Sequence, residues 1–280
     1  MRVLITGATG GIGEALAIRL HQEGAELLLQ GRNQDKLDCL VKLLGKSKIR
    51  VPSIRADIDI EEDRQGLVNL ARSLNVNTLI NNAGVNQFAF FADTDIDRVI
   101  QTNVSSTLRL TQLMLPFLLE NRAPRIVNIG SAFGSIGYPG YVAYCAAKHA
   151  IKGFSEALKR EYADTELELI YISPRATFTD MNAEAANELN LALGVGSDSA
   201  EAVARQIVLA MRKNHCRVQL GFAEKIQTKL NGLLPSLVDQ AISKQLSIIK
   251  HYLNLEHKNE ISHHNSSTAD CESLSYGDVG

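Results

Sequence analysis

The chain lacks the features that mark most nucleic-acid-binding and metal-binding proteins. Its 280 residues contain no tryptophan, and 29 Lys and Arg stand against 31 Asp and Glu, a net charge of −2. Binding to a phosphate backbone depends on a local surplus of cations, so we expect no nucleic-acid partner. The cysteines include no Cys-x-x-Cys pair, so the sequence predicts free thiols and no metal site at Cys39, Cys145, Cys216 and Cys271.

Long apolar runs are also absent. No segment reaches the roughly 18 uninterrupted apolar residues of a membrane span. Met1 and Arg2 lead directly into the short apolar run Val3-Leu4-Ile5, which is typical of a strand rather than of a signal peptide. We therefore expect a cytoplasmic protein.

Short apolar runs alternate with longer helical patterns along the chain. The apolar runs are residues 3–5, 26–29, 78–80, 125–127, 167–172 and 217–220, and the helical patterns are residues 14–22, 34–44, 95–119, 144–162 and 200–213. Strands that are apolar throughout, each followed by a helix, form parallel sheets covered on both faces. The sequence therefore predicts an α/β fold, a Rossmann-type doubly wound parallel sheet, in a single domain over residues 1–221.

A glycine-rich turn follows the first predicted strand. It reads Thr6-Gly7-Ala8-Thr9-Gly10-Gly11-Ile12-Gly13, and a helix is predicted from Glu14. Glycines let the backbone approach a pyrophosphate, which is then held by the unpaired N–H groups and the positive dipole end of the helix. This position between a strand and a helix predicts a dinucleotide site.

The residues after the second predicted strand bear on which dinucleotide is bound. NAD-binding proteins commonly place a carboxylate there to bind the ribose 2′-hydroxyl. This chain has Arg32 and Asn33 instead, and no carboxylate. A guanidinium can hold a 2′-phosphate through charge-assisted hydrogen bonds, so NADP(H) is favoured over NAD(H). The alternative is that Arg32 is a solvated loop arginine.

Tyr144 and Lys148 stand four residues apart in a predicted helix, and therefore on the same face. An ammonium beside a phenol stabilises the phenolate and lowers the tyrosine pKa from about 10. The pair therefore predicts an acid/base catalyst at Tyr144.

These motifs and three others resemble the compact branch of the short-chain dehydrogenase/reductase family. The others are Asn81-Asn82-Ala83-Gly84, then Asn103, and Ser131, which precedes Tyr144 by the 13 residues expected between the family's serine and tyrosine. The glycine spacing through Gly10 and Gly13 also fits the longer branch that modifies sugar nucleotides. Chain length, residues 81–84 and the missing acid near Arg32 favour the compact branch, which the chain resembles over about residues 1–221.

The resemblance implies four catalytic residues. Tyr144 would give a proton to a carbonyl oxygen in reduction, or remove one from an alcohol in oxidation. Lys148 would lower the pKa of Tyr144 and hydrogen-bond the nicotinamide ribose, and Ser131 would hold the substrate oxygen. Asn103, a polar residue with no evident structural use in its helix, would fix a water that continues the proton relay.

The resemblance also implies cofactor contacts outside the glycine turn. Those that brace the cofactor loop and the central sheet are Thr6, Asn82, Ala83 and Gly84. Those beside the adenine are Asp57 and Ile58, although an ordinary strand-end turn is the alternative for Asp57. Those on the nicotinamide side are Pro174, Thr177 and Thr179.

One residue departs from the family's pattern. Arg175 follows Pro174, where the family usually has glycine. An arginine must adopt ordinary backbone angles there or accept strain. Its side chain is expected either to face the substrate or to pack against neighbouring segments.

The segment that would cover the substrate is an irregular stretch over residues 177–198. It is rich in Ala and Leu and has few charges. As a flap it favours an apolar or acyl-chain substrate over a phosphorylated sugar. The alternative is that these residues only pack a lid helix.

Beyond the matched region, residues 222–254 form an extension and residues 255–280 a tail. Between residues 224 and 253, apolar side chains recur at spacings of three and four, interleaved with Lys225, Lys229, Lys244 and Lys250. They predict two basic amphipathic helices, broken around Pro235, that cap the pocket or contact a second subunit, or else touch a membrane surface peripherally. The tail is rich in Ser, His and Asn and is predicted to be disordered.

The sequence as a whole predicts an NADP(H)-dependent oxidoreductase that interconverts a carbonyl and a secondary alcohol on a small molecule. The alternative is a catalytically silent dinucleotide-binding regulator or scaffold. The presence of Asn103, Ser131, Tyr144 and Lys148 disfavours that alternative, because a pure binder needs no acid/base. The resemblance also implies a homodimer or homotetramer joined through the helices that carry Asn103 and Tyr144.

Overall fold

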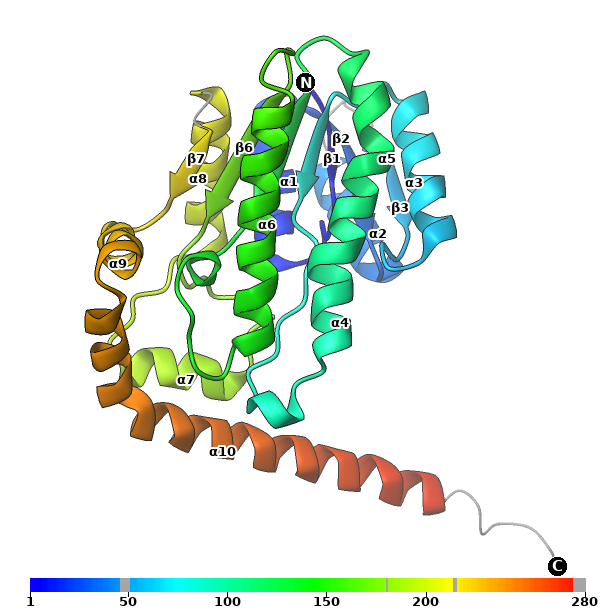
Figure 1. Ribbon diagram of the computed structural model, residues 1–280. Coiled ribbons are helices and arrows are strands. Elements are labelled where there is room, and N and C mark those ends of the chain that lie inside the picture. The colour runs from blue at the N-terminus through cyan, green and yellow to red at the C-terminus, as the bar shows by residue number, and fades with distance from the viewer. Residues whose placement is uncertain (46–50, 180, 214–215, 274–280) are drawn as a thin grey trace, which may run out of the picture.

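A seven-stranded parallel sheet forms the centre of the protein, as seen in a computed structural model (Figure 1). The structure describes residues 1–45, 51–179, 181–213 and 216–273. The strand order is β3-β2-β1-β4-β5-β6-β7. The strands are β1 (Arg2–Ile5), β2 (Glu26–Gly31), β3 (Ser53–Arg55), β4 (Thr78–Asn81), β5 (Arg125–Ile129), β6 (Glu168–Ser173) and β7 (Arg217–Gln219). The predicted doubly wound fold is confirmed.

Helices cover both faces of this sheet because its strands are apolar on both sides. In β1, Val3 and Ile5 pack on one side with α1 (Gly11–Gln22), α2 (Gln34–Leu44) and α8 (Ala200–Arg212). Leu4 packs on the other side with α3 (Glu61–Ser73) and α5 (Thr107–Leu119), and α6 (Val142–Glu161) continues that layer against β6. Alternate residues of a strand thus supply two separate cores.

The strand order reverses direction at β1, whose neighbours are β2 on one side and β4 on the other. The connections after β1 and β4 leave for opposite faces of the sheet. In open α/β sheets this leaves a crevice at the carboxyl ends of the strands, where ligands bind. The glycine-rich turn after β1 and residues 82–84 after β4 both lie at this edge.

The helix predicted over residues 95–119 is not a single α-helix. It comprises α4 (Ile96–Ile100), a π-helical segment η2 (Gln101–Ser106) and α5. A π-helical turn inserts extra backbone into a helix and is frequent at functional sites. The segment contains Asn103, one of the predicted catalytic residues.

The stretch over residues 177–198 is more regular than the sequence indicated. Thr177 and Asp198 form a parallel bridge at its base, and it contains α7 (Glu184–Ala192). Ala185, Ala186 and Leu189 of α7 are buried. Packing against the rest of the chain therefore stabilises α7, in agreement with the lid helix given as the alternative for this segment.

Two helices follow β7, and the prediction of a break around Pro235 agrees with their bounds. They are α9 (Phe222–Leu233) and α10 (Pro235–Ser273), and α10 runs across α7 (Figure 1). Ile249 and Leu253 of α10 are buried in the same cluster as Ala185 and Leu189. Because proline lacks an N–H group, a helix begins readily at Pro235 but does not run through it.

The prediction of a disordered tail was wrong for residues 255–273, which continue α10. Once Ile249 and Leu253 fix the helix by packing, adding a further residue costs little, since propagation is far easier than nucleation. Leu255, Glu256 and Lys258 have good helix propensity. The remainder of the tail, 274–280, lies outside the described residues. Among the described helices, none is both long and apolar enough to cross a membrane.

Candidate active site

The glycine turn forms the floor of a cleft at the switch point of the sheet. Gly7 has a φ of +62°, a conformation that favours glycine, and its N–H donates to Oε1 of Gln30 at 2.9 Å. A Cβ at Gly13 would collide with the carbonyl oxygen of Gly7. Gly10 is the N-cap residue of α1, and no side-chain hydrogen bond caps the helix there. The first turn of α1 therefore meets the cleft with its backbone N–H groups, as an anion-binding helix end requires.

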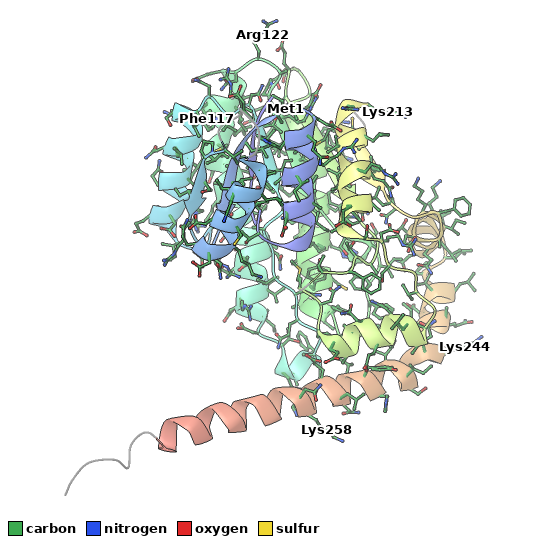
Figure 2. All side chains as sticks on the ribbon, turned by 180° about the vertical axis from the view of Figure 1, so that it is seen from behind. Met1, Phe117, Arg122, Lys213, Lys244 and Lys258 are labelled. Atoms are coloured by element: carbon green, nitrogen blue, oxygen red, sulfur yellow. The ribbon has the colours of Figure 1, made fainter. Side chains whose placement is uncertain are left out.

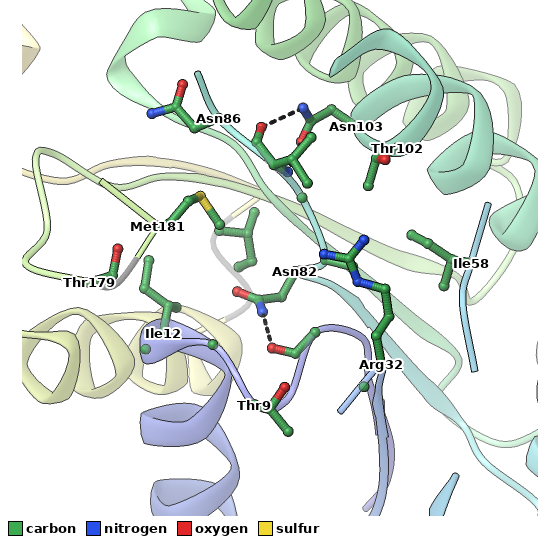
Figure 3. Close-up of a pocket in the computed structure, with 18 of the residues that line it drawn as sticks. Thr9, Ile12, Arg32, Ile58, Asn82, Asn86, Thr102, Asn103, Thr179 and Met181 are labelled. Atoms are coloured by element: carbon green, nitrogen blue, oxygen red, sulfur yellow. Dashed lines mark hydrogen bonds between the residues drawn. The ribbon is translucent and has the colours of Figure 1, made fainter. Parts of the chain in front are cut away.

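The turn is held in place by residues after β4. Oγ1 of Thr6 donates to the carbonyl of Ile80 at 3.2 Å and accepts from the N–H groups of Asn82 and Ala83. Nδ2 of Asn82 donates to the carbonyls of Thr6 and Gly7, both at 3.0 Å, and the second of these bonds is drawn in Figure 3. This geometry agrees with the bracing roles that the resemblance implied.

The cleft encloses about 640 Å³ and brings together most of the predicted residues. Those that line it are Gly7, Thr9, Gly11, Ile12, Arg32, Asn33, Asp57, Ile58, Asn82, Ala83, Gly84, Asn103, Tyr144, Lys148 and Thr179. Ser131, Pro174 and Thr177 line an adjoining cavity. Thr6 is buried behind the turn, and Gly13 is buried within α1.

Arg32 reaches into the cleft at the carboxyl end of β2 (Figure 3). Its side chain is 57% exposed, and Nη1 lies 4.0 Å from Oδ2 of Asp57, at the limit of an ion pair. Asn33 has a structural role, because its side chain accepts from the N–H of Lys36 and caps α2. Lys36 lines the same end of the cleft, so two cations meet there.

Tyr144 and Lys148 lie at the other end of the cleft, on α6. Nζ of Lys148 is 5.5 Å from the centroid of the Tyr144 ring and donates to the carbonyl of Ile129 at 3.1 Å. Burial lowers the pKa of Lys148 to about 8. Burial raises the pKa of Tyr144 above its ordinary value, and a hydrogen bond with the Ser131 side chain partly opposes that rise. The expected depression of the tyrosine pKa is therefore not found, because desolvation of the phenol dominates.

Ser131 follows β5 and caps the short helix η3 (Ala132–Gly134). Its Oγ accepts from the N–H of Phe133 at 3.2 Å. Since the Oγ–H group of Ser131 can still donate, this bond leaves the Ser131 proton for another acceptor. The Ser131 and Tyr144 side chains are hydrogen-bonded to each other, and both line the adjoining cavity.

Asn103 has a structural use that the sequence did not reveal. Its Nδ2 donates to the carbonyls of Val85 and Val99, at 2.7 and 3.0 Å, and its Oδ1 accepts from the N–H of Val85. The bond to the Val85 carbonyl appears in Figure 3. The expectation that the Asn103 side chain has no structural role in its helix was wrong. It ties the π-helical segment η2 to the loop after β4, next to Lys148.

Gln30 and Asn86, which the sequence did not assign to the site, also line the cleft, together with Met181 of the predicted flap. Gln30 is a buried polar residue in an apolar strand and holds both Gly7 and the carbonyl of Ala56. A polar side chain in an otherwise apolar strand needs a hydrogen-bond partner, so the sequence could have indicated Gln30 as a residue of the site. Oδ1 of Asn86 is buried and has no hydrogen-bond partner among the described residues. It is an available acceptor in a lining that Asn86 shares with Tyr144.

A second cavity, of about 440 Å³, opens from the cleft at Tyr144. Its walls are mainly apolar and aromatic, and they come from η3, α6, the segment over residues 177–198, α9 and α10. The rings of Phe133, Tyr138, Tyr141 and Tyr144 form a cluster with centroid separations of 5.0 to 6.4 Å, in which Phe133 and Tyr138 are stacked and the other pairs are tilted or edge-to-face. Tyr144 therefore stands where a polar cleft and an apolar cavity meet.

Arg175 adopts an ordinary backbone conformation, with no positive φ. Its guanidinium donates to the carbonyl of Gly196 and pairs with Asp198 at 3.7 Å and with Glu224 at 3.2 Å. The side chain also lines the apolar cavity. Of the two expectations for this residue, packing against neighbouring segments is the one these contacts favour.

The fold and the site define an enzyme of the dehydrogenase/reductase class. The chain belongs to the short-chain dehydrogenase family, whose model matches residues 1–190. It is 33% identical to nodulation protein G of Rhizobium meliloti over 217 residues, 72% of this chain and 87% of that protein. It is 32% identical to a 3-oxoacyl-(acyl-carrier-protein) reductase of Haemophilus influenzae over 214 residues, covering 72% and 88% of the two chains.

Solved structures share the fold. A short-chain dehydrogenase of Sphingobium yanoikuyae in complex with NADPH superposes with a TM-score of 0.72 at 26% identity, over 85% of this chain and 95% of that one. A short-chain dehydrogenase/reductase of Burkholderia phymatum in complex with NAD has a TM-score of 0.77 at 24% identity, over 84% and 94%. The same fold thus occurs with either dinucleotide.

Proposed function

We propose that this enzyme is an NADP(H)-dependent oxidoreductase that interconverts a carbonyl and a secondary alcohol on an apolar substrate. The observation that carries the proposal is the position of Tyr144. It lies at the junction of a glycine-floored cleft and an apolar cavity, hydrogen-bonded to Ser131 and next to Lys148. An acid/base between a cofactor site and a substrate site is what carbonyl reduction requires.

The cleft fits a nicotinamide dinucleotide. A Cβ at Gly13 would close the turn, and the bare N-terminus of α1 suits a pyrophosphate. Arg32 and Lys36 at the adenine end favour a 2′-phosphate and hence NADP(H). Asn86 offers an unpaired oxygen, and Lys148 an ammonium, at the other end. When bound, the nicotinamide supplies or accepts the hydride.

The chain's own residues would manage the proton and the substrate oxygen. Tyr144 would give its phenolic proton to the oxygen of a carbonyl, or take one from an alcohol. Ser131 would hold that oxygen by a hydrogen bond as negative charge develops on it. Lys148, protonated below its pKa of about 8, would stabilise the phenolate left on Tyr144. Asn103 would position the loop that carries Val85.

The cavity supports an apolar or acyl-chain substrate. Phe133, Tyr138, Leu189 and Leu230 contribute to its walls, and no phosphate-binding cluster of cations does so among the described residues. An apolar substrate that binds against aromatic and aliphatic walls is removed from water, and this stabilises the complex. The relative from Haemophilus influenzae acts, by its name, on 3-oxoacyl groups. That likeness supports the same substrate class here.

We also propose a homodimer or homotetramer joined through the helices next to Asn103 and Tyr144. Ile96 of α4 and Val142 of α6 are apolar and exposed on that side. Burying such side chains against a second copy removes them from water. Light scattering of the wild type and of Val142→Asp tests this assembly, and a monomeric wild type at micromolar concentration would refute it.

The experiment that tests the reaction compares Tyr144→Phe with Tyr138→Phe, a control tyrosine in the wall of the same cavity. Turnover of a panel of ketones should fall by about two to four orders of magnitude in Tyr144→Phe and persist in Tyr138→Phe. NADPH binding, followed by its fluorescence, should survive in both. A wild type that binds NADPH and reduces no carbonyl compound would instead identify the silent binder.

A further inference from the structure

Helix α9 binds the rest of the protein through its polar side. Nδ2 of Asn231 donates to the carbonyl of Ser135 at 2.9 Å, and Glu224 pairs with Arg175. No side chain of α9 is fully buried. A surface helix normally turns its apolar side toward the core and its charges toward water. In α9 the hydrogen bond and the ion pair that hold the helix are on its inner side, where Leu230 is the apolar residue that lines the cavity, and the most exposed side chains are apolar.

The opposite side of α9 is apolar and faces outward. Phe222 is 81% exposed, Leu233 79% and Ile226 51%, and their spacing of four and seven residues places them on one face. Leu234 and Leu237, on either side of Pro235, continue the exposed surface. We call these five residues the outer face. Contiguous exposed apolar surface of this kind marks a contact site.

The charges on α9 indicate the chemistry of the partner. Lys225 and Lys229 are exposed beside the outer face, and Glu224, the one acidic residue of the helix, is turned inward to Arg175. Lys244 of α10 also points away from the body of the protein (Figure 2). Cations around an apolar stripe are complementary to an anionic lipid surface. In a symmetric pair of chains the same lysines would face each other, which disfavours a second copy.

The outer face also adjoins the apolar cavity. Leu230, Val238 and Ile242 line the cavity from the inner side of α9 and α10. Leu237 lines it too and is 48% exposed, so the rim of the cavity reaches the outer face. An apolar molecule dissolved in a bilayer would therefore meet the cavity without crossing bulk water.

We infer that α9 and the first turn of α10 dock on an anionic lipid surface through Phe222, Ile226, Leu233, Leu234 and Leu237, with the rim of the substrate cavity at the lipid. The docking is inferred from the outer face and does not depend on the proposed function. Delivery of a lipid-dissolved ketone to Tyr144 rests, in addition, on the proposed function.

Flotation with vesicles tests the docking without any turnover. The full chain should float with vesicles of phosphatidylcholine and phosphatidylglycerol at low salt, and not with phosphatidylcholine alone. Each lysine near an anionic surface strengthens binding about fivefold. Lys225→Gln combined with Lys229→Gln should therefore weaken binding by roughly 30-fold. Phe222→Ser with Leu233→Ser should abolish it. The matched controls are Leu43→Ser and Lys42→Gln, exposed residues of α2.

The outcomes separate this inference from the proposed function. Tyr144→Phe should float like the wild type, and Phe222→Ser with Leu233→Ser should retain wild-type turnover of a water-soluble ketone while losing turnover of a ketone held in anionic vesicles. A wild type that stays unbound at low salt would overturn the docking. So would a solution dimer that Phe222→Ser with Leu233→Ser converts to monomers, because a second copy would then cover the outer face.

Discussion

Nε of Arg175 lies 3.2 Å from Oε1 of Glu224, which joins the loop after β6 to the first turn of α9. The same guanidinium pairs with Asp198 at the base of the segment over residues 177–198. One side chain thus connects the loop after β6 to Asp198 and to Glu224, 23 and 49 residues further along the chain, at the wall of the apolar cavity. The glycine that the family resemblance led us to expect at position 175 has no side chain and could make neither ion pair.

Replacing Arg175 by glycine should loosen the cover of the cavity. Glu224 and Asp198 would lose their partner in a partly buried place, and we expect the free energy of unfolding to fall by about 1–3 kcal/mol. The KM for an apolar ketone should rise while NADPH affinity stays unchanged. Arg175→Lys keeps the positive charge, so its unfolding free energy and its KM should lie between those of the wild type and Arg175→Gly. Unaltered stability and KM in Arg175→Gly would show that the three contacts are incidental.

The buried ammonium of Lys148 should make stability depend on pH. Its pKa is about 8 in the folded protein and 10.5 ordinarily, so the unfolded chain binds this proton more tightly. Below pH 8 the folded protein bears the full free-energy cost of burying the charged Lys148 ammonium. As pH rises from 8 toward 10.5 the buried amine loses its proton, and this cost is removed. Relative to Lys148→Met, the wild type should gain on the order of 3 kcal/mol across that window.

Denaturant titrations of both proteins at several pH values measure this gain. Lys159→Met, an exposed lysine of the same helix, is the control and should track the wild type. A constant difference between wild type and Lys148→Met from pH 7 to 10 would contradict the buried charge.

Arg32 should discriminate between the two dinucleotides. Arg32→Ala should weaken NADPH binding by about 1–2 kcal/mol, because the guanidinium is exposed and water competes for its hydrogen bonds. NADH binding should change little. Arg55→Ala, an exposed arginine of β3 paired in register with Gly31, is the matched control. Isothermal titration measures both ligands, and equal losses for NADPH and NADH would assign Arg32 to loop support alone.

The two parts of α10 should differ in their effect on stability. Leu253 is the last buried side chain among those the structure describes, and it packs with Leu189 and Ala185 of α7. Leu253→Ala should cost about 2–5 kcal/mol. Ending the chain after Asn254 should cost less than about 1 kcal/mol, because little apolar surface is lost. Thermal and denaturant unfolding compare the two, and the reverse order would place the anchoring contacts beyond residue 254.

The linear order of motifs sufficed to predict the fold class, six of the seven strands, the glycine turn and the Tyr144–Lys148 pair; the short edge strand β3, whose residues are only partly buried or exposed, was not predicted. Apolar strand patterns, glycine turns and helical spacing are local properties, and each can be recognised in a short run of residues. Arg32 was placed correctly in the cleft for the same reason, since it directly follows β2. The break at Pro235 likewise follows from the chemistry of one residue.

Other features depend on segments that meet only in the folded chain. The π-helical segment and the bonds of Asn103 to Val85 join residues 18 positions apart. The raised pKa of Tyr144 follows from its burial, and burial is decided by surrounding segments that a local motif does not specify. The direction of α9 was set by Arg175 and Ser135, which hold its polar side, and so its apolar side faces outward. Periodicity in the sequence identifies an amphipathic helix, but which side is buried is decided by the partners that tertiary packing supplies.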